Sequence, residues 1–175
     1  MTDKPVWSHR VSLGEVGRAG RALTLVADEA ARKRIARLLD LAELSRLEAD
    51  VTVSPWFDGV QLDGRWRADL VQTCGVTLEP LPAALEHAFT ARAVPPDSVH
   101  APDPEAELVI DLEAEDPPDV IEGDQIDLAA YVVEDLALEI DPFPRKPGVE
   151  FEPPKDDAEL SPFAVLKKLR EPPGS

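Results

Sequence analysis

Residues 44–70 read LSRLEADVTVSPWFDGVQLDGRWRADL, and apolar and polar side chains alternate along much of this stretch. In its first part the apolar positions are Leu47, Ala49, Val51 and Val53, and in its last part they are Trp66, Ala68 and Leu70. A period of two is typical of β-strands that bury one face. We therefore predict half-buried antiparallel strands at the centre of the fold.

The dipeptide Asp63-Gly64 lies between these two runs and is typical of a β-hairpin turn. A two-residue loop would place Leu62 opposite Arg65 and spoil the facing pattern. A three-residue loop pairs Leu62 with Trp66 and keeps both apolar side chains on one face. We predict the hairpin in that form.

Upstream of this stretch, short β-like runs at residues 6–13 and 22–26 are separated by glycines. Asp28 is a good N-cap for a helix from Glu29 to Leu41. An apolar stripe with helical spacing supports that helix and contains Ala31, Ile35, Leu38, Leu39 and Ala42. We expect these elements to pack against the central strands.

Downstream, Pro80 and Pro82 interrupt the pattern, and residues 84–94 alternate again, which predicts another strand. Residues 95–124 are acidic and rich in proline, which favours solvated loops with one strand at residues 107–112. Asp124 can then cap a helix that reaches Ile140. Its apolar stripe contains Ile126, Ala129, Val133, Leu136 and Ile140, and its opposite face contains Asp127, Glu134 and Asp135.

Pro142 and Pro144 end that helix, and residues 142–160 have the composition of an extended connector. Ser161 and Pro162 then form a second clean helix start. The apolar stripe of this terminal helix is Phe163, Leu166 and Leu169. About nine residues is marginal for an isolated helix, so the segment docks on the domain, docks on a partner, or stays partly unfolded.

Together these elements predict an α+β fold of mostly antiparallel strands, with an N-terminal helix, an acidic helix after the sheet and a short C-terminal helix. A length of 175 residues suits one domain with a real core. We place that domain at residues 1–141, with acidic loops at about 95–124. Residues 142–175 form the connector and the terminal helix.

The net charge of −17 is concentrated in one segment. Residues 79–141 contain 18 Asp and Glu against one Lys or Arg, whereas the flanking segments are balanced. Such a segment disfavours broad attraction to a phosphate backbone and favours basic partners. We therefore interpret Asp127, Glu134 and Asp135 as candidate partner-binding residues.

A basic run in the first helix is the candidate RNA contact and comprises Arg32, Lys33, Arg34 and Arg37. A charged helix face is usually a solvated surface, and Glu29 with Lys33 is an ordinary i, i+4 ion pair. An RNA contact and a solvated helix face therefore both stay open as interpretations of this run. The sequence contains no phosphate-binding loop, no nucleophile motif and no metal-ligand spacing among its three histidines and Cys74. We expect no enzyme activity, no metal and no cofactor.

The longest run without a charged side chain, residues 70–78, is too short to cross a bilayer. The first residues lack the apolar core of a signal peptide, so we expect a cytoplasmic protein. One cysteine allows no disulfide within the chain. Trp7, Trp56 and Trp66 are interpreted as core or sheet-face residues.

Three segments resemble the YceD family of large ribosomal RNA subunit accumulation proteins. They are residues 70–81, LVQTCGVTLEPL; residues 123–138, from GDQIDL to VEDLAL; and residues 161–169, SPFAVLKKL. Many relatives have a second cysteine near the position of Cys74, and some have another pair after the acidic helix. This chain has neither, so a zinc-binding property does not carry over.

The resemblance implies a role in the accumulation of large-subunit (23S) ribosomal RNA, and so in ribosome biogenesis. We expect a non-enzymatic assembly factor that binds a basic ribosomal protein or a pre-ribosomal large subunit. Direct contact with rRNA through the basic helix is the alternative, and a metal-dependent RNA hydrolase is a more remote one. The sequence leaves the oligomeric state open.

Overall fold

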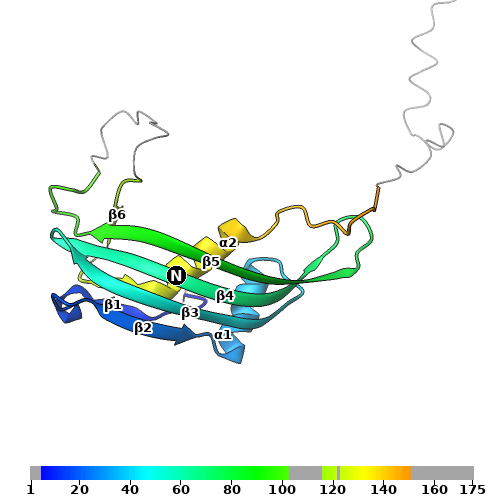
Figure 1. The fold of residues 1–175 in the computed structure, drawn as a ribbon, viewed down its shortest axis with the longest axis horizontal. Helices are drawn as coiled ribbons and strands as arrows, with labels where there is room; N and C mark the ends of the chain where they lie inside the picture. Colours follow the sequence, from blue (N-terminus) through cyan, green and yellow to red (C-terminus); the bar gives the residue numbers. More distant parts are fainter. Residues whose placement is uncertain (1–4, 103–115, 122, 151–175) are drawn as a thin grey trace, which may run out of the picture.

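The structure is a computed structural model that describes residues 5–102, 116–121 and 123–150. Within these residues, a strongly curved five-stranded sheet carries two α-helices on one face, and a two-stranded sheet lies beside it (Figure 1). The buried side chains of both helices and of the sheet form one hydrophobic core. The α+β fold predicted from the sequence is confirmed.

The larger sheet has the strand order β2-β3-β4-β5-β6. Its strands are β2 (Arg21–Val26), β3 (Glu43–Trp56), β4 (Gly59–Thr73), β5 (Pro80–Val94) and β6 (Asp119–Val120). All neighbours are antiparallel except β5 and β6, which are parallel. The smaller sheet pairs β1 (Arg10–Ser12) with β7 (Gln125–Asp127), and the short 3-10 helix η1 (Leu13–Glu15) follows β1.

The alternation in residues 44–70 is confirmed as the pattern of the central strands. The inward side chains of β3 and β4 are buried and include Leu47, Ala49, Val51, Val53, Leu62, Trp66, Ala68 and Leu70. The intervening side chains lie on the opposite face, which no described helix covers. A β-bulge between Leu44 and Arg46 shifts the register at the start of β3.

The predicted hairpin at Asp63-Gly64 is wrong, because β4 runs straight through it. The chain turns earlier, at Phe57 and Asp58, where Trp56 pairs with Gly59. Gly64 pairs with Phe89 of β5, and a Cβ at Gly64 would lie 2.3 Å from an atom of the Phe89 ring. The glycine therefore makes room for an aromatic ring on the sheet and does not mark a turn.

β5 begins at Pro80, four residues before the predicted start at Ala84, and includes Pro82. Among the described residues, β6 pairs only with Ala93 and Val94, so the rest of that side of β5 is a sheet edge. Proline is tolerated at an edge because the missing N–H faces no neighbouring strand. The two prolines thus lie inside a strand that they were expected to interrupt.

Helix α1 (Glu29–Leu38) is capped as predicted, since Asp28 accepts a hydrogen bond of 2.6 Å from the Ala31 N–H. The helix ends three residues earlier than predicted. Asp40 has a φ of 52° and turns the chain, so that Leu41 packs into the core from the loop. Leu38 lies outside the core with 59% of its surface exposed, contrary to the predicted stripe.

Helix α2 (Leu128–Glu139) begins later than predicted, and its N-cap is Asp127 in place of Asp124. Residues 125–127 form β7, because Ile126 and its neighbours pair with β1. The Leu13 N–H also donates to the Asp124 carbonyl over 2.8 Å. The apolar side of α2 is confirmed by its buried residues, which are Leu128, Ala129, Val132, Val133 and Leu136.

Residues 141–150, the described part of the connector, contain no helix or strand. The strand expected at residues 107–112 lies outside the described residues. The end of the connector and the helix with Phe163, Leu166 and Leu169 also lie outside them. The proposed division at residue 141 stays a prediction.

Candidate functional site

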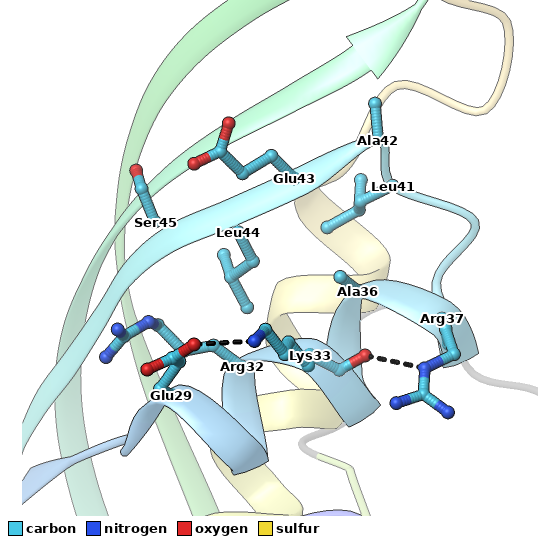
Figure 2. A pocket seen from close by; sticks show the side chains of 10 residues that line it. All are labelled: Glu29, Arg32, Lys33, Ala36, Arg37, Leu41, Ala42, Glu43, Leu44 and Ser45. Carbon is cyan, nitrogen blue, oxygen red and sulfur yellow. Dashed lines mark hydrogen bonds and ion pairs between the residues drawn. The ribbon is translucent and has the colours of Figure 1, made fainter.

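An open groove between α1 and the start of β3 contains three of the four basic residues predicted to contact RNA (Figure 2). Its volume is about 540 Å³, and Arg32, Lys33 and Arg37 lie along its helical side. Its apolar part includes Ala36, Leu41 and Leu44. The fourth basic residue, Arg34, does not line the groove and donates from Nε to the Val6 carbonyl over 2.7 Å.

The cations of this groove are already engaged with neighbouring groups. Lys33 Nζ contacts Glu29 Oε1 at 2.5 Å, and this bond lowers the pKa of Glu29. Arg37 donates to the Lys33 carbonyl over 3.2 Å, and Arg32 donates to the Ala27 carbonyl over 2.6 Å. Because Glu29 and Glu43 also line the groove, its positive potential is modest.

Two of the three predicted acidic residues hold the fold together. Asp127 caps α2 and also accepts hydrogen bonds from Ser8 Oγ at 2.5 Å and from the His9 N–H at 2.8 Å. It thereby joins the N-terminal segment to the start of α2. A carboxylate with three such donors is a structural residue, and little of it is left for a partner.

Asp135 lies against the sheet, although the helical pattern placed it on the polar side of α2. Its Oδ2 accepts from Trp66 Nε1 over 2.6 Å and lies 2.9 Å from His87 Nδ1. On the other side of the imidazole, Nε2 lies 3.6 Å from Glu139 Oε1. The hydrogen bond to Asp135 raises the pKa of His87.

The third predicted residue, Glu134, is exposed on the outer side of α2. One turn later on the same helix, Leu138 exposes 82% of its surface. Asp141 is exposed just beyond the end of the helix. The Asp141 carboxylate also accepts a hydrogen bond from the Phe143 N–H over 2.8 Å. The outer side of α2, defined by Glu134, Leu138 and Asp141, therefore has an exposed apolar side chain with one carboxylate a turn before it and another three residues after it in the chain.

The turn between β4 and β5 is tied to the segment after α2 through Cys74, whose thiol is fully buried. The backbone N–H groups of Thr77 and Lys146 point at Sγ, at 3.5 Å and 3.4 Å. Hydrogen bonds from Thr77 and then from Lys146 lower the pKa of Cys74 to about 6. Lys146 Nζ also contacts Glu79 at 2.9 Å. These contacts of Cys74 and Lys146 hold the turn between β4 and β5 against the segment after α2 without a second thiol.

A cluster of three rings at the turn between β3 and β4, of which Phe57 is exposed and the other two are half-buried, was missed by sequence reasoning. Trp56, Phe57 and His100 lie within 6 Å of one another, measured between ring centroids. Trp56 was expected in the core or on a sheet face, and it is the half-buried last residue of β3. Its position beside a second aromatic residue, just before the true turn, is the signal that could have indicated a surface cluster.

The described part of the chain holds no group of three or more His, Cys, Asp or Glu side chains arranged to bind a metal ion. No described helix is long and apolar enough to span a membrane. Both findings concern only the residues that the structure describes.

A family model described as large ribosomal RNA subunit accumulation protein YceD matches residues 62–170, which is more than half of the chain. No curated protein and no solved structure matches this chain significantly. The matched span begins in β4 and includes β5 and α2, whereas α1 with its basic run lies outside it.

Proposed function

Because this chain belongs to the YceD family of large ribosomal RNA subunit accumulation proteins, we propose that it is a non-enzymatic assembly factor that binds a basic ribosomal protein. Membership of the family implies a role in the accumulation of large-subunit rRNA. The proposal adds a mechanism: the protein acts on the RNA indirectly, by holding a protein component of the pre-ribosomal large subunit.

The observation that carries the proposal is the outer side of α2. Leu138 is exposed there, with Glu134 one turn earlier and Asp141 three residues later in the chain, in the part that the family model matches. An exposed apolar side chain bordered by carboxylates suits a segment in which lysine or arginine flanks an apolar residue. Asp127 and Asp135 support this surface by fixing the position of α2.

The charge of the chain supports the same class of partner. Residues 79–141 contain 18 acidic side chains and a single basic one, Arg92. A field of this sign accelerates encounters with a basic protein and repels the phosphates of rRNA. Ribosomal proteins that bind rRNA are the basic class that such a field attracts.

Direct contact with rRNA is the second candidate, and the groove beside α1 is the observation that favours it. Arg32, Lys33 and Arg37 gather there on one side of the groove (Figure 2). The negative charges of Glu29 and Glu43 in the same groove disfavour binding of rRNA phosphates. The groove also lies outside the span matched by the family model. We therefore rank it below protein binding.

Crosslinking and purification from cells separates the two candidates. The triple substitution Glu134→Gln, Leu138→Ala, Asp141→Asn should reduce the crosslinked ribosomal protein at least tenfold. Replacing Arg32, Lys33 and Arg37 with glutamate should leave it unchanged, and Glu48→Gln, on the uncovered sheet face, is the matched control. The opposite pattern, with rRNA as the crosslinked species, would establish the second candidate, and no effect of either set would refute both.

A purified-protein assay tests the non-enzymatic part of the proposal. We expect no magnesium-dependent cleavage of a precursor of large-subunit rRNA. Cleavage that is lost when the exposed acids of residues 116–141 are neutralised would instead show a hydrolase.

A further inference from the structure

The aromatic cluster at the turn between β3 and β4 has the geometry of a preformed binding surface. The Phe57 and His100 rings are stacked, with centroids 4.0 Å apart and planes 23° from parallel. The Trp56 ring meets Phe57 edge-on at 4.7 Å. Phe57 nevertheless exposes 71% of its surface, although the other two rings contact its ring.

Backbone contacts fix this arrangement. Phe57 has a φ of 49°, a left-handed conformation that is rare for a bulky residue. Ser98 Oγ donates to the Asp58 carboxylate over 2.8 Å and accepts from the His100 N–H over 3.0 Å, which ties the loop after β5 to the turn. Residues held in strained conformations cluster at functional sites.

One cation–π contact is already present in the cluster. The Arg92 guanidinium carbon lies 5.2 Å from the centre of the Trp56 ring, within the range of an attractive interaction. Arg92 is also the single basic residue of residues 79–141. The cluster therefore shows in its own structure the kind of group that its rings accept.

We propose that the exposed face of Phe57 binds an arginine side chain of the basic partner protein. This inference rests on the proposed function and adds a second, separate contact to it. Asp58 lies in the turn itself, and Asp97 is exposed and precedes Ser98, whose hydroxyl donates to the Asp58 carboxylate. Carboxylates beside an aromatic face favour a guanidinium and disfavour the phosphates that accompany a nucleobase.

The test uses a peptide of alternating glycine and arginine that carries a dye and a photo-crosslinker. Its affinity for the full chain is measured at physiological salt. The Phe57→Leu variant keeps an apolar side chain but loses the ring, so affinity should fall about threefold to fivefold. Phe57→Tyr keeps the ring and should bind within twofold of the wild type. The matched control is Val99→Ala, a residue 91% exposed in the same loop, which should change nothing.

Mass spectrometry of the crosslinked peptide should place it on the turn or on the loop with His100. His100→Gln, which removes the ring stacked on Phe57, is a second variant that should weaken binding. Equal affinity of Phe57→Leu and the wild type would overturn the proposal. So would a single-stranded RNA that loses affinity in Phe57→Leu while the peptide does not.

The proposed function can fail separately. If the triple variant of α2 still captures the ribosomal protein, the outer side of α2 is not its binding site. The Phe57-dependent crosslink to the arginine peptide is unaffected by that result. If the triple variant loses capture and Phe57→Leu still binds the arginine peptide normally, only the aromatic contact is wrong.

Discussion

The two helices pack against the same face of the sheet, but their charged residues serve different purposes. On α1 the Lys33 ammonium pairs with Glu29 one turn away, and Arg37 bonds a carbonyl of its own helix. On α2 the carboxylates of Asp127 and Asp135 reach other elements, namely the N-terminal segment and the strands β4 and β5. Helix α1 is thus held mainly by its apolar stripe and by one polar bond to another segment, from Arg34 to the Val6 carbonyl, whereas α2 is joined to the N-terminal segment and to two strands by several polar bonds.

This difference shows that acidic residues on one helix need not share a role. Asp127 and Asp135 stabilise the domain, which leaves Glu134 as the predicted acid that faces outward on α2. Loss of binding after a change at Asp127 or Asp135 would therefore report on stability as much as on a partner. Three sets of substitutions test this contrast between the helices.

Asp135→Ala should have the largest effect, because it removes the acceptor of the Trp66 indole N–H, a side chain that is almost fully buried. A buried donor without a partner, together with the lost charged hydrogen bond, should cost about 2 to 3 kcal/mol. Denaturant unfolding measures the loss. Asp135→Asn keeps an oxygen acceptor and should retain most of the stability, and a loss below about 0.5 kcal/mol in Asp135→Ala would contradict the fastening of α2.

The two N-caps give an intermediate effect and a direct comparison of the helices. Asp28→Ala removes a local cap of α1 and should cost about 1 kcal/mol. Asp127→Ala removes a cap of α2 and also the bonds from Ser8 and His9, so it should cost about 2 kcal/mol. The measurement is again denaturant unfolding. Equal losses would show that Asp127 is only a cap.

The smallest expected effect is the pH dependence that His87 gives to the free energy of unfolding through its contact with α2. Its pKa is raised above 6.5 by Asp135, so protonated His87 stabilises the folded state. That contribution is fully present below pH 6.5 and is lost as pH rises through the pKa of the folded state. Because the side chain is 40% exposed, solvent screens the pair and keeps the effect small.

Comparison of the wild type with His87→Gln across this pH range measures the contribution. The difference in the free energy of unfolding should shrink as pH rises, and it should depend less on pH in an Asp135→Asn background, where Glu139 is the carboxylate that still faces the imidazole. A constant difference in the unaltered background would contradict the link between His87 and Asp135.

Local patterns in the sequence predicted α1 and the central strands, because a cap and a repeated spacing determine them. The errors came from contacts between distant residues. Asp63-Gly64 has the composition of a turn, yet the ring of Phe89 across the sheet is what requires the glycine. Likewise, residues 125–127 continue a helical pattern, but pairing with β1 draws them into a strand.

The candidate sites follow the same division. The gathering of Arg32, Lys33 and Arg37 follows from helical spacing and was predictable. The inward position of Asp135 was not, because its partners Trp66 and His87 come from two strands far away in sequence. The aromatic cluster depends on a loop about 40 residues from the turn, which no local pattern reveals.

In the part of the chain that the structure describes, one side of β5 is unpaired before β6, and this edge bears on how copies of the protein behave in concentrated solution. An open strand edge can join another edge and start aggregation. Pro80 and Pro82 protect one end of this edge, and the net charge of −17 makes copies of the protein repel one another. Colloidal stability should therefore fall when acid neutralises the carboxylates or when high salt screens them.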